Sequence, residues 1–157
     1  MPRGKKSWEV NGYQVRSKLE MLVLTDLVNK GVDFTYETES YVWVEKLPRA
    51  FCAACGEKAA FVERSYTPDV FLPNDIIVEV KGIFTSHDRK IAAAMKEQHP
   101  HLDIRMVFQR DNKLSRASST RYSTWCEKKG IKWAINKIPM EWILEDPMEL
   151  MLEDSNN

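Results

Sequence analysis

The sequence predicts an α/β (α+β) fold in which a mixed central β-sheet is flanked by helices. A chain of 157 residues suits one compact domain, and its hydrophobic (43%) and charged (29%) fractions are ordinary for such a domain. Apolar residues follow the helical period in some segments and the strand period in others. These segments alternate as helix, antiparallel strands, helix, strand, helix, strand, helix, an order typical of one sheet with helices packed on it.

The first half of the chain is predicted to hold one helix and several strands. The helix covers 13–30, where apolar residues recur at helical spacing up to a stop at Gly31. Strands are expected from aromatic and β-branched residues, or from alternation, at 32–36, 41–44, 65–72 and 76–80. The last two form a hairpin with its turn at 73–75, and the segment 46–64 is predicted to be an inserted loop.

The second half is predicted to alternate helices and strands. Thr85 caps a helix over 86–98, with Asp88 three residues further on and Pro100 as its end. A strand follows at 103–109. After a polar loop we expect a short helix, a strand and a last short helix, at 121–129, at 131–135 and from Pro139 onward.

Charge is unevenly distributed along a chain whose formal net charge is zero. Arg105 to Lys137 contain nine Lys or Arg and two acidic residues, whereas no basic residue follows Lys137. The basic stretch indicates either a face that binds nucleic acid or an ordinary solvated surface. The acidic segment 146–157 is expected to be a flexible tail behind a single domain at 1–145.

Two further features predict a cytoplasmic protein. No apolar run approaches the ~18 residues that cross a bilayer, and the N-terminus lacks the apolar segment of a signal peptide. Three cysteines, Cys52, Cys55 and Cys126, are too few and too unevenly placed for a disulfide framework, which fits a reducing compartment.

The predicted hairpin carries charged residues among strand-forming apolar ones. Strand alternation places Glu79 and Lys81 on one face of the second strand. If the turn has three residues, Asp69 on the first strand lies directly opposite Glu79, whereas a two-residue turn would send Asp69 to the other face. The sequence therefore predicts two carboxylates and an ammonium group that converge across one turn.

Two adjacent carboxylates repel each other, and this repulsion is costly unless a positive charge lies between them. Oxygen ligands suit Mg²⁺, which binds one or two protein carboxylates together with substrate phosphates. Such a metal lowers the pKa of a bound water, which a nearby lysine can orient or help to deprotonate. The expected chemistry is phosphodiester hydrolysis, and the alternative is a surface hairpin with a cross-strand ion pair.

Short motifs around these residues extend along most of the chain. Pro68-Asp69 with Glu79-Val80-Lys81 matches the PD-(D/E)XK nuclease signature. Further motifs are RSKLE (16–20), FTYE (34–37), YTPD (66–69), LPN (72–74), DRK (88–90), EQHP (97–100), LDIR (102–105), CEKKGIKWA (126–134) and IPMEWI (138–143). With these motifs the chain resembles the bacteriophage endonuclease I family of Holliday junction resolvases. The resemblance covers nearly all of the chain except 46–64 and the two ends.

The resemblance implies a homodimer with exchanged segments that acts in DNA recombination. Such an enzyme uses Mg²⁺ or Mn²⁺ to nick two strands of a four-way junction, here in the cytoplasm of the host cell. Asp69, Glu79 and the backbone carbonyl of Val80 correspond to metal ligands, and Lys81 to the catalytic lysine. Glu20 on the first helix, otherwise an ordinary flanking glutamate, corresponds to an acid that completes the partner subunit's site.

A two-fold symmetric dimer suits a junction with two equivalent strands to cut. Selectivity for branched DNA is expected to come from contacts with phosphates and from DNA shape. Candidate DNA-binding residues are Arg16, Lys18, Arg89, Lys90, Arg105, Arg110, Lys113, Arg116 and Arg121. Alternatives are a mismatch- or restriction-type PD-(D/E)XK endonuclease, or a non-catalytic DNA-binding protein that keeps the fold.

The insertion at 46–64 departs from the family pattern through its Cys-x-x-Cys sequence. Cys52 and Cys55 form half of a structural Zn²⁺ site. Two subunits could together supply four cysteines, or ligands from the same chain could complete the site, namely His87, His99, His101 or Cys126. The alternative is a turn with two unpaired thiols.

Overall fold

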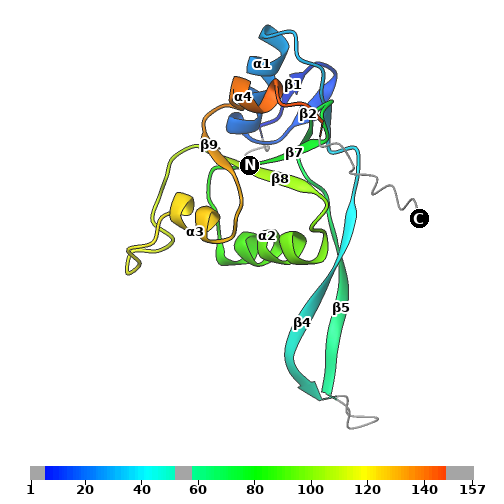
Figure 1. Cartoon of the computed structure of the whole chain (residues 1–157), viewed down its shortest axis with the longest axis vertical. Helices are drawn as coiled ribbons and strands as arrows, with labels where there is room; N and C mark the ends of the chain where they lie inside the picture. Colours follow the sequence, from blue (N-terminus) through cyan, green and yellow to red (C-terminus); the bar gives the residue numbers. More distant parts are fainter. Residues whose placement is uncertain (1–5, 52–57, 148–157) are drawn as a thin grey trace, which may run out of the picture.

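The computed structural model describes residues 6–51 and 58–147, and a mixed five-stranded sheet lies at its centre (Figure 1). The strand order is β3-β6-β7-β8-β9, with bounds Thr35–Tyr36, Val70–Phe71, Ile76–Lys81, Asp103–Phe108 and Trp133–Ile135. Neighbours from β3 to β7 are antiparallel, and those from β7 to β9 are parallel. The mixed sheet confirms the predicted α/β class.

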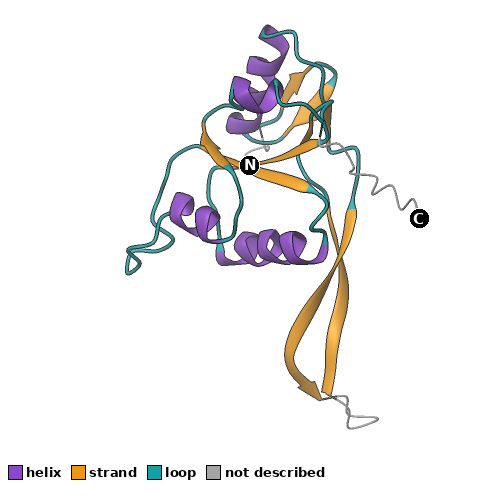
Figure 2. Cartoon of the chain, viewed as in Figure 1, coloured by secondary structure: helices purple, strands orange, loops and turns teal. Residues whose placement is uncertain are grey.

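Helices cover both faces of this sheet, as Figure 2 shows, and each face has its own apolar core. The helices are α1 (Lys18–Asn29), α2 (Ser86–Gln98), α3 (Tyr122–Lys128) and α4 (Met140–Ile143). Val78 and Val80 of β7 belong to the core that contains α1 and α4, whereas Met106 and Phe108 of β8 belong to the core that contains α3. Glu79 and Lys81 alternate with the valines and therefore lie on the α2 side of β7.

Local signals set the bounds of α2, which agree with the prediction. Thr85 accepts a hydrogen bond from the Asp88 backbone, and the Asp88 side chain accepts one from the Thr85 backbone, so the capping box is complete. The helix ends at Gln98, two residues before Pro100. The strand predicted at 103–109 and the short helices near Gly130 and Pro139 are also confirmed within one or two residues.

The predicted helix at 13–30 was too long at its N-terminal end. Residues before Ser17 form a small hairpin of β1 (Trp8–Val10) and β2 (Tyr13–Val15). Its turn, Asn11-Gly12, has positive φ angles of 50° and 82°, as hairpin turns of this kind require. Ser17 accepts a hydrogen bond from the Glu20 backbone at 3.0 Å, and this N-cap starts α1.

The prediction of a loop at 46–64 was wrong for 46–51 and 58–64, because these residues belong to the two strands of a long antiparallel hairpin. Strands β4 (Tyr41–Phe51) and β5 (Lys58–Tyr66) pair from Tyr41–Tyr66 outward and project away from the sheet (Figure 1). The register shifts between Lys46 and Ala50, and Pro48, which has no backbone N–H, falls in this irregularity. Pro48 and the charged residues of this segment interrupt the alternation of apolar and polar residues, so the sequence pattern did not predict strands here. The segment predicted as one strand at 65–72 is likewise divided between β5 and β6.

Side chains of α2 hold the base of this hairpin. Gln98 accepts from the backbone N–H of Val44 at 2.7 Å and donates to the Val44 carbonyl at 2.9 Å. His99 bonds the carbonyl of Val42 at 2.7 Å, and Lys90 pairs with Glu45. The free edge of β4 is thus satisfied where it passes the helix.

Within the described residues, no helix is both long enough and apolar enough to span a bilayer.

Candidate functional site

The turn between β6 and β7 places Asp69 across from Glu79. Val70 pairs with Val78, Phe71 pairs with Ile77, and a bond of 2.9 Å from Leu72 N to Ile76 O closes a three-residue turn. Asp75 occupies this turn with a φ of 66°, the left-handed conformation that three-residue hairpin turns need. Continued by one position, this register sets Asp69 opposite Glu79, so the predicted turn length is confirmed.

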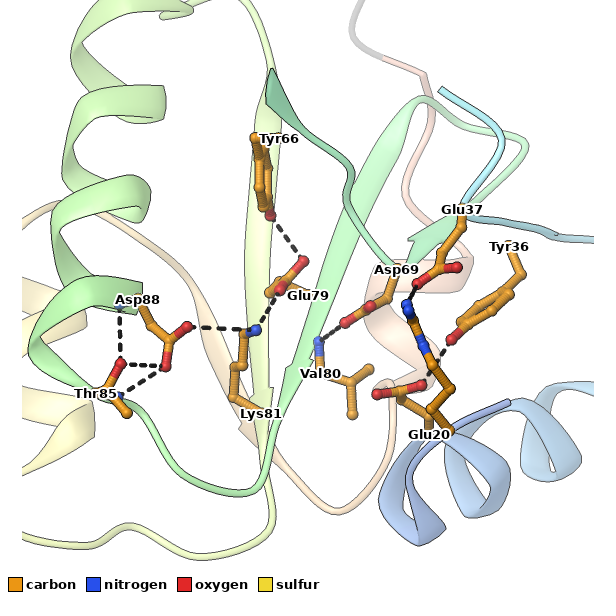
Figure 3. Close-up of polar contacts among 11 residues, drawn as sticks. Glu20, Tyr36, Glu37, Tyr66, Asp69, Glu79, Val80, Lys81, Thr85 and Asp88 are labelled. Atoms are coloured by element: carbon orange, nitrogen blue, oxygen red, sulfur yellow. Dashed lines mark hydrogen bonds and ion pairs between the residues drawn. The ribbon is translucent and has the colours of Figure 1, made fainter. Parts of the chain in front are cut away.

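Lys81 lies between two carboxylates. Its Nζ is 3.0 Å from Glu79 Oε1 and 3.5 Å from Asp88 Oδ1 (Figure 3). The other oxygen of Asp88 accepts hydrogen bonds from the backbone N–H and the hydroxyl of Thr85, at 2.9 and 2.8 Å. The N-terminal turn of α2 therefore contacts the lysine. The capping pattern was visible in the sequence, but it did not reveal that Asp88 also faces this site.

Asp69 and Glu79 are buried carboxylates, 7% and 5% exposed. Burial and the charge of Glu79 raise the pKa of Asp69 well above its ordinary range, although the Val80 backbone N–H, 2.7 Å from Asp69 Oδ2, opposes this shift. Burial also raises the pKa of Glu79, against the opposing effects of Lys81 and Tyr66. One lysine does not offset the cost of burying two negative charges, so the pair favours an additional cation.

Lys81 remains protonated in this setting. Burial by itself lowers the pKa of the ammonium group, but the charges of Glu79, Asp88 and Asp69 outweigh it and raise the pKa above the usual lysine value. The side chain therefore acts here as a cation and a hydrogen-bond donor.

Glu20 reaches the same cavity from the first turn of α1. Its Oε2 accepts a hydrogen bond from the Tyr36 hydroxyl at 2.7 Å, and its charge contributes to the raised pKa of Asp69. A cavity of about 320 Å³ is lined by Glu20, Asp69, Glu79 and Lys81, together with Arg16 and Asp88 among others. One chain thus brings the four predicted catalytic residues together. A larger cavity of about 620 Å³, near Asn74 and His101, includes none of these four.

The donor atoms of the cavity fit a small hard cation. Among residues 6–51 and 58–147, no three His, Cys, Asp or Glu side chains are close enough together to form a complete metal site. Asp69 and Glu79 nevertheless supply two carboxylates, and Mg²⁺ usually takes one or two from a protein. Glu79 Oε1 is now paired with Lys81 and Oε2 with Tyr66, so a cation at Oε1 would compete with the lysine.

The cysteine pair predicted as half of a zinc site, Cys52 and Cys55, lies outside the described residues. Cys126 is buried in the core beside α3, and burial raises the pKa of its thiol to about 12. A neutral, enclosed thiol is a poor metal ligand. His99 is engaged with the Val42 carbonyl.

One of the predicted DNA-binding residues is placed wrongly for that role. Arg105 is 1% exposed, and its guanidinium binds the carboxylates of Asp103 and Glu145 at 2.6 to 2.9 Å and lies 5.2 Å from the centre of the Trp142 ring. Arg105 is therefore a core residue and not a surface contact for phosphates. The sequence did not predict this burial, because one of the two partners of Arg105, Glu145, lies 40 residues away in the chain.

The other basic candidates lie at or near the surface. Arg89 is partly buried, and its guanidinium donates to the carbonyl of Phe84 at 2.7 Å. Arg16 pairs with Glu37 at the rim of the cavity. The exposed candidates are Arg16, Lys18, Lys90, Arg110, Lys113, Arg116 and Arg121. Their role in DNA binding stays a prediction.

Tyr36, Tyr66 and Asp88 are polar neighbours of the site that the sequence did not reveal. Tyr66 donates its hydroxyl to Glu79 Oε2 at 2.8 Å, and Tyr36 makes the equivalent bond to Glu20 (Figure 3). Burial and these carboxylates raise the pKa of both hydroxyls, so they remain donors. Both tyrosines lie inside the motifs FTYE and YTPD, and this position was the sequence signal that could have identified them as neighbours of the site.

The fold and the cavity define a mixed α/β protein with a buried site of three acids and a lysine. The sequence model described as phage endonuclease I matches residues 3–155. The chain is 44% identical over 136 residues to Endonuclease I of Escherichia phage T7, covering 86% of this chain and 82% of that protein. It is 39% identical over 140 residues to Endodeoxyribonuclease 1 of Enterobacteria phage T3, covering 88% and 83%. This chain belongs to the phage endonuclease I family.

Proposed function

We propose that this protein is an endodeoxyribonuclease that resolves four-way junctions and other branched DNA by metal-dependent hydrolysis of phosphodiester bonds. The observation that carries the proposal is the single cavity shared by Glu20, Asp69, Glu79 and Lys81. Membership of the phage endonuclease I family, with relatives named as endonucleases, supports the reaction class.

Asp69, Glu79 and the backbone carbonyl of Val80 are the groups that would hold Mg²⁺ or Mn²⁺. When bound, such an ion stabilises negative charge on the phosphate and lowers the pKa of a bound water. Glu20 faces the same space and adds a third acidic side chain. The buried carboxylates, whose mutual repulsion a cation would relieve, are the structural support for this assignment.

Lys81 has a separate task in the proposed reaction. Because its ammonium group is protonated, it donates hydrogen bonds to the attacking water or to a non-bridging phosphate oxygen. Donors preorganised towards developing charge stabilise a transition state without the cost of reorienting solvent. Asp88 and Glu79 keep the ammonium group inside the cavity.

The proposed active form is a homodimer with exchanged N-terminal segments. Glu20 precedes the β4–β5 hairpin in the chain, whereas Asp69, Glu79 and Lys81 follow it. The site is therefore assembled from two parts of the chain that one long hairpin joins. The same contacts can form when the two parts come from different subunits, and a two-fold symmetric enzyme presents two such sites to the two equivalent strands of a junction.

A comparison of substrates tests this proposal. We expect Mg²⁺-dependent nicking of a synthetic four-way junction at a much higher rate than nicking of a linear duplex of the same sequence. Equal cleavage of both substrates would favour a mismatch- or restriction-type endonuclease. Junction binding without cleavage in Mg²⁺ or Mn²⁺ would favour a non-catalytic DNA-binding protein.

A further inference from the structure

Two tyrosines hold the two glutamates of the cavity in the same way. The hydroxyl of Tyr36 donates to Oε2 of Glu20 at 2.7 Å, and the hydroxyl of Tyr66 donates to Oε2 of Glu79 at 2.8 Å. Tyr36 is the last residue of β3 and Tyr66 is the last residue of β5. Each ring thus extends from a strand end towards one carboxylate (Figure 3).

Asp69 is held by a different donor with the same result. The backbone N–H of Val80 donates to Asp69 Oδ2 at 2.7 Å. Glu20 and Asp69 therefore each have one carboxylate oxygen bound to a donor on a strand, whereas Glu79 has both oxygens bound, Oε2 to Tyr66 and Oε1 to Lys81 at 3.0 Å. A carboxylate fixed in this way loses rotational freedom, and its second oxygen keeps a defined direction.

The two tyrosine–glutamate pairs lie on opposite sides of the β4–β5 hairpin in the chain. Glu20 and Tyr36 precede the hairpin, Tyr66 is its last residue, and Glu79 follows it. Each part of the chain therefore orients its own glutamate, whichever subunit supplies the other part.

We propose that Tyr36 and Tyr66 are positioning residues for metal binding, each fixing the orientation of one glutamate of the cavity, with the cation taking the place of Lys81 at Glu79 Oε1. This inference rests on the proposed metal-dependent function. Hydrogen-bond partners of metal ligands typically contribute 10- to 100-fold to metal affinity or activity, which is roughly the expected effect of losing either hydroxyl. Because the two tyrosines bind different glutamates, the double variant should lose more Mn²⁺ affinity than either single variant.

The test is a calorimetric titration of the full chain with Mn²⁺ in the absence of DNA. Tyr36→Phe and Tyr66→Phe keep the rings and remove only the hydroxyl groups. Tyr41→Phe is the matched control, because the Tyr41 hydroxyl donates to Glu39 at 3.0 Å on the exposed surface, outside the cavity. We expect roughly 10-fold weaker Mn²⁺ binding for each site variant and unchanged binding for Tyr41→Phe.

A second readout separates metal positioning from general damage. Cleavage of a four-way junction by Tyr66→Phe should be slow at low Mn²⁺ and should approach the wild-type rate at saturating Mn²⁺, with an unchanged thermal unfolding midpoint. If one site variant does not fold, the other tyrosine–glutamate pair provides the same test.

The outcomes distinguish this inference from the function on which it rests. A wild-type chain that does not bind Mn²⁺ overturns the metal-dependent function and the inference together. Wild-type binding that both site variants retain in full overturns only the role of the tyrosines. Equal weakening in Tyr41→Phe and in the site variants would also overturn it, because the effect would not come from the cavity.

Discussion

Asp88 Oδ1 lies 3.5 Å from Lys81 Nζ, so the aspartate that completes the capping box of α2 also contacts the lysine of the cavity. Glu79 is the closer partner of this lysine, at 3.0 Å. If a cation takes Glu79 Oε1, Asp88 remains as the second acceptor that keeps the ammonium group in place. The helix cap and the proposed chemistry thus share one carboxylate.

Asp88→Asn should slow single-turnover junction cleavage roughly 10-fold, because it removes the negative charge of the partly buried ion pair that Asp88 Oδ1 forms with Lys81 Nζ at 3.5 Å. Junction affinity measured in Ca²⁺ should stay unchanged. Thr85→Ala is the control, since it removes the cap, at about 1 kcal/mol of stability, and leaves the contact between Asp88 and Lys81. Equal slowing in both variants would mean that Asp88 acts only through the helix cap.

Lys81→Ala and Glu79→Ala should abolish cleavage and retain junction binding. Both residues are buried or half-buried in the cavity, whereas the exposed arginines and lysines that we expect to contact phosphates, apart from Arg16 at the cavity rim, do not line it. Gel-shift titrations and cleavage assays on the same junction measure the two properties separately. Parallel loss of binding and cleavage would argue against this division.

Mixed dimers of Glu20→Ala and Asp69→Ala subunits should retain one working active site. If Glu20 serves the partner's site, one of the two sites in the mixed dimer contains every required residue and the other lacks two. The expected product is a junction nicked in one strand, and either variant alone should be inactive. A completely inactive mixed dimer would instead show that each site is built within one chain.

Arg105→Ala should lower the free energy of unfolding by about 2 to 3 kcal/mol. The guanidinium is buried, but its partners Asp103 and Glu145 are about one-third exposed, which places the loss at or below the 3 to 5 kcal/mol typical of a broken buried pair. Arg110→Ala, at an exposed position, should change the free energy of unfolding by no more than about 0.5 kcal/mol. Urea denaturation distinguishes the two, and similar small effects would contradict the core role of Arg105.

Acid should weaken the contact between Glu145 and Arg105. Its hydrogen bonds to Arg105 lower the pKa of Glu145 from 4.5 to about 2. Because the folded-state pKa is depressed, the contribution to stability is complete above the unfolded-state pKa and is lost as the pH falls through the window from about 4.5 to about 2. The stability difference between wild type and Glu145→Gln, measured by urea denaturation, should therefore shrink across that window. A constant difference would show that the carboxylate charge does not contribute.

Local sequence features predicted much of the sheet and its central pair of acids. The alternation through 76–80 placed Asp69 opposite Glu79 on the condition of a three-residue turn, and the structure has that turn at Pro73, Asn74 and Asp75. Thr85 and Asp88 likewise predicted the start of α2. In the region before Ser17, the Asn11-Gly12 turn was a usable signal for the first hairpin that the helical pattern obscured.

The sequence by itself thus determined the fold class and the family, because these depend on short-range periodicity, turn chemistry and motifs. Only the tertiary structure decided that Tyr36 and Tyr66 donate to the glutamates and that Arg105 is buried. Each of these facts depends on contacts between side chains more than ten residues apart in the chain. Such contacts form only when helices and strands pack, and no local pattern encodes which residues then meet.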